Sequence, residues 1–166
     1  MRNRSSLLLF TLAAGIAGIA VHPSPAAAAK SNAEVAFDFF RHRGLSKAAA
    51  AGIVGNLVQE SNVNPRSSQA GGPGRGIAQW SSPGRWDSLT KYAHERHTSP
   101  QALNTQLWFI WHELTANPAF GLQELRVAKT VPAATKVFEK KYEICGDCEE
   151  SNRIAQAQTT LRNYGG

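Results

Sequence analysis

The stretch 46–60, SKAAAAGIVGNLVQE, constrains the fold more than any other part of the chain. Ser46 can cap the start of a helix, and the alanines that follow it favour a helix strongly. Apolar residues at helical spacing form a stripe along this segment, consisting of Ile53, Val54 and Leu57. Gly52 and Gly55 would let neighbouring helices approach closely. The segment therefore predicts a helix from Lys47 to about Glu60, packed against other helices.

The helical pattern continues through most of the remaining chain. Six further helices are predicted, over residues 31–43, 82–97, 99–117, 119–128, 130–143 and 150–164. Residues 62–76 differ, because they are rich in glycine and polar residues and predict a loop or a short hairpin. No repeat and no long linker divides the chain. The predicted fold is all-α (mainly α). It consists of one compact multi-helix domain with one glycine-rich loop or short hairpin.

The first residues have the layout of a secretory signal peptide. Two arginines precede an uncharged apolar run over residues 7–21, and the alanines at 26–29 suit a cleavage site. The apolar run is short for a membrane span, which needs about 20 residues. We therefore expect residues 1–29 to be a cleaved leader rather than a membrane anchor. Residues 30–166 would then form one secreted domain.

Charge and cysteine content restrict the partners. Removing the leader's two arginines lowers the formal charge from +6 to +4, which suits a soluble protein that meets anionic polymers such as cell walls. No basic run with interleaved aromatic residues supports nucleic-acid binding. Cys145 and Cys148 are most simply a small disulfide in an exported chain. A redox pair or half of a metal site are the alternatives, but neither a thioredoxin-like context nor a second cysteine pair accompanies them.

Glu60 is the first candidate for acid chemistry. It stands at the C-terminal end of its predicted helix, where the helix dipole disfavours a carboxylate, and Val58 and Val63 flank it. Both effects favour the protonated acid that glycoside cleavage requires. Downstream, Gln79 offers an amide to sugar hydroxyls, and Trp80 offers a flat face to a sugar ring. The alternatives are that Glu60 is a solvated surface glutamate, that Gln79 is a polar loop residue, and that Trp80 is a core aromatic residue.

Four segments carry a resemblance to a known family: LSKAAAAGIVGNLVQESNVNP, GRGIAQW, LNTQLWFIWHEL and VFEKKYE. In this order they resemble the phage-tail lysozyme family of the lysozyme-like superfamily, from about Asn32 to Gly166. They are also similar to the Glu-Ser and Gly-Leu-Met-Gln motifs of lytic transglycosylases. Two departures are a signal peptide, where phage members belong to tail structures, and a cysteine loop, where the family often has a proline-rich turn.

The resemblance implies a lysozyme-like fold, peptidoglycan glycan strands as the partner, and no cofactor. It implies Glu60 as the catalytic acid, with Ser61 beside it in the motif and Gln79 in the substrate cleft. Tyr142 falls near a late aromatic residue that faces the acid in related enzymes. We expect a monomer that cleaves the MurNAc–GlcNAc β-1,4 bond as a muramidase or a lytic transglycosylase.

The spacing of acidic residues bears on the mechanism. A two-carboxylate glycosidase needs a second acid roughly 5–9.5 Å from the first. No acidic residue lies between Glu60 and Asp87, and Asp87 falls in a predicted helix where a solvated role is favoured. The sequence therefore favours a mechanism with a single catalytic glutamate, assisted by the substrate's N-acetyl group.

Other sites and functions are weaker. His112-Glu113 resembles the start of a zinc-protease motif, but Ala116 replaces the second histidine. His94 and His97 have a spacing that can bind metal, although a solvated helix face is the simpler interpretation. We therefore expect no metal. The alternative function is a non-catalytic wall-binding module, which would use basic and aromatic residues for glycan contact, namely Arg66, Arg75, Trp80, Arg85 and Trp86. A toxin delivered against rival bacteria would share the same chemistry.

Overall fold

The computed structural model describes residues 29–145 and 148–166. The predicted signal peptide, residues 1–29, lies outside the described residues apart from Ala29. Among the described helices, none is both long enough and apolar enough to cross a membrane.

Helices make up most of the described chain. The seven α-helices in these residues are α1 (Asn32–His42), α2 (Lys47–Ser61), α3 (Arg85–Glu95), α4 (Leu103–Ala116), α5 (Leu122–Val127), α6 (Val131–Phe138) and α7 (Glu150–Tyr164). A 3₁₀ turn, η1 (Pro118–Phe120), precedes α5, and a π-helical segment, η2 (Glu139–Glu143), continues α6. A two-residue hairpin pairs β1 (Gly74–Arg75) with β2 (Trp80–Ser81) in antiparallel register. The prediction of a mainly α domain is confirmed.

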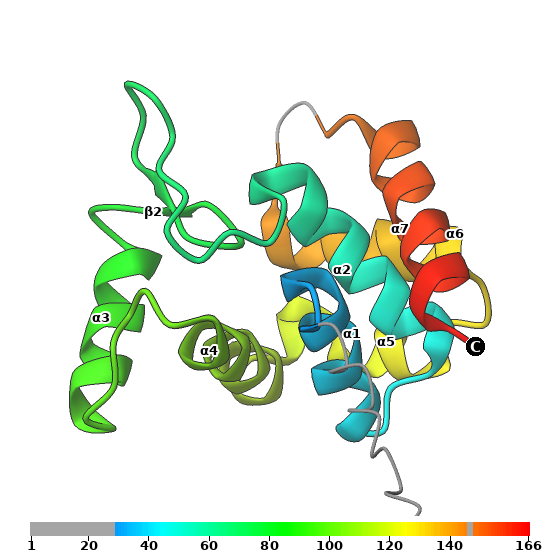
Figure 1. Ribbon diagram of the computed structural model, residues 1–166, viewed down its shortest axis with the longest axis horizontal. Helices are drawn as coiled ribbons and strands as arrows, with labels where there is room; N and C mark the ends of the chain where they lie inside the picture. The colour runs from blue at the N-terminus through cyan, green and yellow to red at the C-terminus, as the bar shows by residue number, and fades with distance from the viewer. Residues whose placement is uncertain (1–28, 146–147) are drawn as a thin grey trace, which may run out of the picture.

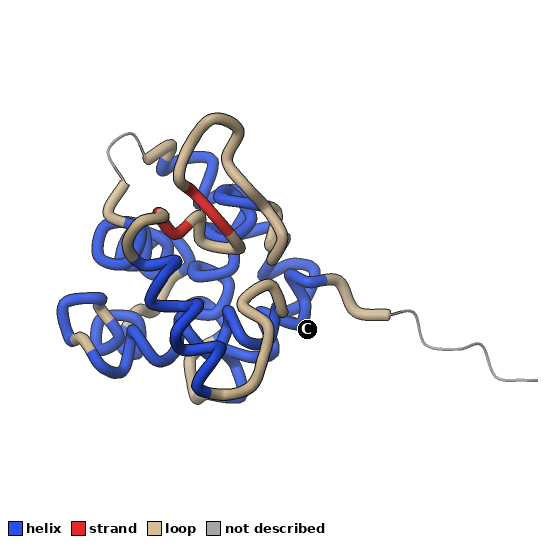
Figure 2. Tube along the Cα trace, turned by 90° about the vertical axis from the view of Figure 1, so that its left-hand side faces the viewer, coloured by secondary structure: helices blue, strands red, loops and turns tan. Residues whose placement is uncertain are grey.

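The helices form two groups. In Figure 1, α3 and α4 lie on one side, and α2 lies within the larger group of α1, α5, α6 and α7. The glycine-rich loop with β1 and β2 lies near the C-terminal end of α2, and Figure 2 shows both strands within this loop at one end of the molecule. The loop and the end of α2 are therefore neighbours, as the candidate site requires.

Local capping signals predicted several helix starts correctly. The side chains of Ser31, Ser46 and Thr130 each accept a hydrogen bond from the backbone N–H three residues later. The predicted start of α4 at Ser99 is wrong, because Ser99 caps a turn and the helix begins at Leu103. The single helix predicted over 119–128 is divided at Gly121, whose φ of 85° ends η1 before α5 begins.

The core surrounds α2. All residues from Ala49 to Leu57 are buried, so this helix touches neighbours on every side. A Cβ atom built on Gly55 would lie 2.5 Å from the backbone nitrogen of Ala157 in α7, and one on Gly52 would lie 2.7 Å from that of Thr135 in α6. The two glycines therefore allow close contacts that no larger residue permits.

We predict that Gly55→Ala destabilises the fold. Helix propensity alone would favour alanine by about 1 kcal/mol, but the added methyl group would meet backbone atoms that cannot rotate away. Overpacking of this kind costs about 1–3 kcal/mol, so the unfolding midpoint in urea should fall. Gln158→Ala is the matched control, because it changes an exposed residue of α7 next to the contact. An unfolding midpoint that is higher in Gly55→Ala than in the natural protein would show that α2 and α7 can move apart to accept the methyl group without loss of stability.

Candidate active site

Glu60 and Gln79 share one surface cavity. The cavity has a volume of about 360 Å³ and lies between the end of α2, the glycine-rich loop and the end of η2. Its lining consists of Glu60, Gln69, Ala78, Gln79, Glu143 and Cys145. Polar groups dominate this lining, and two of them are carboxyl groups. The two residues that the sequence ranked highest therefore lie together.

Arg153 of α7 holds Glu60 in place. Its Nη2 atom donates to Oε1 of Glu60 at 2.6 Å, its Nη1 to Oδ1 of Asn56 at 3.1 Å, and its Nε to the Cys148 carbonyl at 2.6 Å. The Arg153 side chain is 6% exposed and that of Glu60 is 19% exposed, so the pair is largely shielded from water. A charge-assisted hydrogen bond of this kind stabilises a carboxylate. The expectation from the helix end alone, which favoured the protonated form, left out this partner.

Asn56 connects the pair to the centre of the domain. It is fully buried on α2, and its Nδ2 atom donates to the carbonyl oxygens of Gly52 at 2.8 Å and Thr135 at 3.2 Å. These bonds orient its Oδ1 atom toward Arg153. The position of the Glu60 carboxylate thus depends on a polar chain that runs through α2, α6 and α7.

The end of α2 has an unusual backbone. Asn62 and Val63 both have positive φ values, 53° and 54°, directly after Glu60 and Ser61. A β-branched residue such as valine pays a steric penalty in this region, and Val63 is fully buried where it adopts it. The Ser61 hydroxyl donates to the Ile77 carbonyl at 2.9 Å, which ties the helix end to the loop. Ser61 therefore joins structural elements and does not line the cavity.

Gln79 is held by its own loop. It has a φ of 45°, and its Nε2 atom donates to the Gly76 carbonyl at 2.8 Å. The loop is held in turn by Gln106 of α4, which is fully buried. Gln106 accepts from the Ile77 N–H at 2.9 Å and donates to the carbonyls of Pro65 and Pro100. The role of Gln106 could not be predicted from the sequence, because a glutamine within a helical pattern does not indicate which backbone groups its side chain will bind.

Trp80 and Tyr142 lie in the core behind the cavity. Trp80 is 1% exposed and Tyr142 is 0% exposed, so neither ring offers a face to a ligand. Trp80 Nε1 donates to the Tyr142 hydroxyl at 3.3 Å, and that hydroxyl donates to Glu113 Oε2 at 2.5 Å. Burial, together with the Glu113 charge, holds the pKa of Tyr142 well above its ordinary value. The interpretation of Trp80 as a sugar platform, and of Tyr142 as a substrate contact, is corrected to a core role.

Arg85 and Glu113 belong to the same hydrogen-bond network as Tyr142. Arg85 forms two parallel hydrogen bonds with the Glu113 carboxylate, at 2.9 and 2.8 Å, and a third with the Tyr142 carbonyl at 3.0 Å. Glu113 is therefore a structural anion and not the base of a zinc protease. Arg85, which the wall-binding alternative used for glycan contact, is likewise occupied within the protein.

Glu143 is the acidic residue that sequence analysis missed. It ends η2, directly after the anchored Tyr142, and it lines the cavity together with Glu60. Burial, and then the charge of Glu60, raise the pKa of Glu143 well above its ordinary value. The preference for a single catalytic glutamate considered only the acids between Glu60 and Asp87 in sequence, and Glu143 is a second carboxyl group at the same cavity. Asp87 itself is exposed and accepts from the Gly84 N–H at the start of α3.

Cys145 and Cys148 form a disulfide, with an S–S distance of 2.08 Å. Because the two sulfur atoms are bonded to each other, they do not act as thiolate ligands, although Glu139 lies near them. The disulfide follows η2 and precedes α7. It thus covalently joins the segments that carry Glu143 and Arg153.

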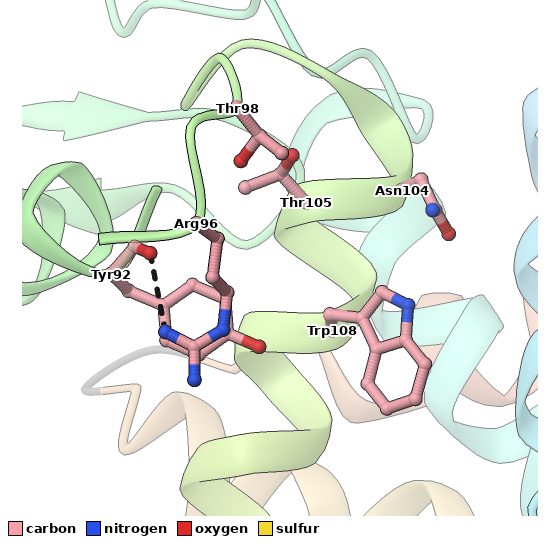
Figure 3. Close-up of a pocket in the computed structure, with 6 residues that line it drawn as sticks. All are labelled: Tyr92, Arg96, Thr98, Asn104, Thr105 and Trp108. Carbon is pink, nitrogen blue, oxygen red and sulfur yellow. Dashed lines mark hydrogen bonds between the residues drawn. The ribbon is translucent and has the colours of Figure 1, made fainter. Parts of the chain in front are cut away.

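A larger cavity, of about 440 Å³, lies between α3 and α4 (Figure 3). Its lining consists of Tyr92, Arg96, Thr98, Asn104, Thr105 and Trp108. The Arg96 guanidinium lies over the Tyr92 ring, 3.7 Å from its centre. This set contains no carboxyl group among the described lining residues, in contrast to the smaller cavity that Glu60 lines. His94 and His97 are both exposed on α3 and the turn after it.

Comparison with known proteins agrees with this fold. The sequence profile described as phage tail lysozyme matches residues 31–164. The chain belongs to the phage tail lysozyme family. A search of curated proteins found none that matches the chain. Membership of the phage tail lysozyme family indicates a lysozyme-like peptidoglycan hydrolase with glycosidase-type activity, and it confirms the resemblance drawn from the four sequence segments.

We predict that Glu143→Gln stabilises the fold at neutral pH. Because the pKa of Glu143 is raised in the folded state, the folded protein binds a proton that the unfolded chain releases above its ordinary pKa. Stability therefore falls as pH rises from about 4.5 through the raised pKa. Glutamine has no charge to bury, so the variant should gain about 1–3 kcal/mol at pH 7 and little at pH 4.

Thermal unfolding at both pH values measures this difference. Glu95→Gln is the control, because Glu95 is exposed on α3 and should change stability little at either pH. An equal effect of Glu143→Gln at pH 4 and pH 7 would contradict the raised pKa.

Proposed function

We propose that this protein is an exported enzyme that cleaves the β-1,4 bond between MurNAc and GlcNAc in peptidoglycan, with Glu60 as the acid. The observation that carries the proposal is the position of the Glu60 carboxyl group. It faces a polar, open cavity together with Gln79, in a chain of the phage tail lysozyme family. The apolar leader at residues 7–21 and the disulfide support export.

In the proposed reaction, Glu60 gives its proton to the glycosidic oxygen. The C–O bond breaks, its electron pair stays on the leaving oxygen, and a positive charge develops on the muramyl ring. The N-acetyl oxygen of the substrate stabilises this charge, because Glu143, the other carboxyl group that lines the cavity, has a raised pKa and so favours its neutral form. Glu60, now a carboxylate, takes a proton from the muramyl 6-hydroxyl or from water while the oxygen of that group forms a bond to the anomeric carbon. Attack by the 6-hydroxyl gives an anhydro product, and attack by water gives a reducing end.

The remaining residues have supporting roles in this proposal. Gln79 lines the cavity beside Glu60 and presents an amide to the sugar. Arg153 holds one oxygen of the Glu60 carboxyl group at the edge of the cavity that Glu60 lines. The proposal includes neither cofactor nor metal, and neither nucleic acid nor membrane as a partner; it treats the protein as a monomer.

We predict that Glu60→Gln loses about 10²–10⁴-fold of its wall-degrading activity, because general acid catalysis contributes that much. Glutamine still accepts a hydrogen bond from Arg153, so the fold should persist and the loss should report chemistry. The measurement is mass spectrometry of soluble muropeptides released from purified peptidoglycan. Anhydromuramyl products would identify a lytic transglycosylase, and reducing ends a muramidase.

Asp87→Asn serves as the control, because Asp87 is the other acid that the sequence raised, and its variant should retain activity. Full activity in Glu60→Gln would show that another group is the acid. Binding to the wall without any release of products, by the natural protein, would support the wall-binding module instead.

A further inference from the structure

Glu143 is half-buried, and one of its carboxyl oxygens has no hydrogen bond. Its Oε1 atom is inaccessible to solvent and has no hydrogen-bond partner among the described residues. A buried polar group without a partner is costly, and most such groups are paired in folded proteins. An apolar residue would avoid this cost. Glu139 also has a buried, unpaired carboxyl oxygen, but of the two acids Glu143 is the one that lines the cavity with Glu60.

The charges around Glu143 do not balance. The charged groups that face it are Glu60 of α2, Arg85 of α3, Glu113 of α4 and Arg153 of α7. Arg85 is bonded twice to Glu113, and Arg153 is bonded to Glu60. Each arginine is thus matched by one carboxylate, and Glu143 is the third carboxyl group with no cation of its own.

Three neighbouring carboxyl groups with two cations cannot all ionise easily. Removing water penalises each charge, and like charges at one site repel. Burial and the charge of Glu60 raise the pKa of Glu143, so this carboxyl group favours its protonated form. Arg153 bonds to Glu60 alone of the two, so the proton resides on Glu143 before substrate arrives.

We propose that Glu143 is a positioning residue that stores this proton and delivers it to Glu60. This inference rests on the proposed function, because it explains how Glu60 can act as an acid although Arg153 stabilises its carboxylate. The proton moves from the Glu143 carboxyl group to Glu60, directly or through one water, and then to the glycosidic oxygen. The proton taken from the 6-hydroxyl or from water returns to the pair, so each turnover leaves the pair unchanged.

The position of Glu143 supports this role. Tyr142, its neighbour in η2, is fixed by Trp80, Arg85 and Glu113. π-Helical turns often occur at functional sites, and here the turn joins a core anchor to a cavity carboxyl group. The backbone at Glu143 is therefore held beside the cavity that Glu60 also lines.

The experiment is a pH profile of kcat/KM for muropeptide release by the purified protein and three variants. Glu143→Gln has no proton to store and no charge to repel that of Glu60. We expect its activity to fall about tenfold at pH 7 and to stay within about threefold of the natural protein at pH 4.5, with the alkaline limb about one pH unit lower. Glu143→Asp should restore part of the neutral-pH activity.

Glu139→Gln is the matched control. Glu139 is a buried acid of the same π-helical segment, its pKa is also raised by burial, and it does not line the cavity. Its profile should follow that of the natural protein. Carbon NMR of the carboxyl groups gives a readout independent of turnover, because the natural protein should show a proton uptake well above the ordinary glutamate range that Glu143→Gln lacks.

Three results would overturn the proposal. A Glu143→Gln profile that superimposes on the natural one would reduce Glu143 to a structural role. A folded Glu143→Gln variant that loses activity equally at every pH would make Glu143 itself the proton donor. Absence of the high-pH uptake in NMR would show that no proton is stored. If the natural protein releases no products at any pH, the proposed function fails first, and this result is distinct from the other three.

Discussion

The close contact of α2 with α7 is the constraint on which the candidate site depends. Gly55 of α2 meets Ala157 of α7, and a turn away Arg153 meets Glu60. Because α2 and α7 run antiparallel, a single register between the two helices sets both of these residue pairs. If the helices separated, the bonds from Arg153 to Glu60 and Asn56, which are 2.6 and 3.1 Å long, would lengthen and weaken steeply. The geometry of the Arg153–Glu60 pair thus depends on Gly55, whose lack of a side chain lets the two helices approach closely.

A second helix fixes the other carboxyl group. α6 packs against Gly52 through Ala134 and runs alongside α2, so its continuation, η2, arrives beside the end of α2. The π-helical turn changes the angular relation between successive side chains. Tyr142 is thereby directed into the core while Glu143 reaches the cavity. Both acids sit at helix ends whose positions are set by packing farther along the same helices.

Local patterns predicted the helices well and the contacts poorly. Capping serines and apolar spacing act within a few residues, so the starts of α1, α2 and α6 could be found from sequence. Glu60 and Gln79 could be placed together because only 19 positions separate them and a motif links them. Arg153 and Glu143 could not, because their partners lie 93 and 83 positions away and depend on how the helices pack. The sequence could not decide the role of Trp80, because an aromatic ring is equally suited to a protein core and to a sugar-binding site.

The buried charges around Tyr142 and the charges at the cavity obey the same rules but give different results. Arg85 and Glu113 satisfy each other with two parallel hydrogen bonds, and Tyr142 completes the arrangement, so this cluster rigidifies the core. At the cavity, the single hydrogen bond from Arg153 to Glu60 leaves Glu143 uncompensated. A fold selected only for stability would remove that carboxyl group, since replacing a buried charge by a neutral residue is often stabilising. The position of this carboxyl group beside Glu60, in a chain of the phage tail lysozyme family, fits the role of proton store that we propose for it.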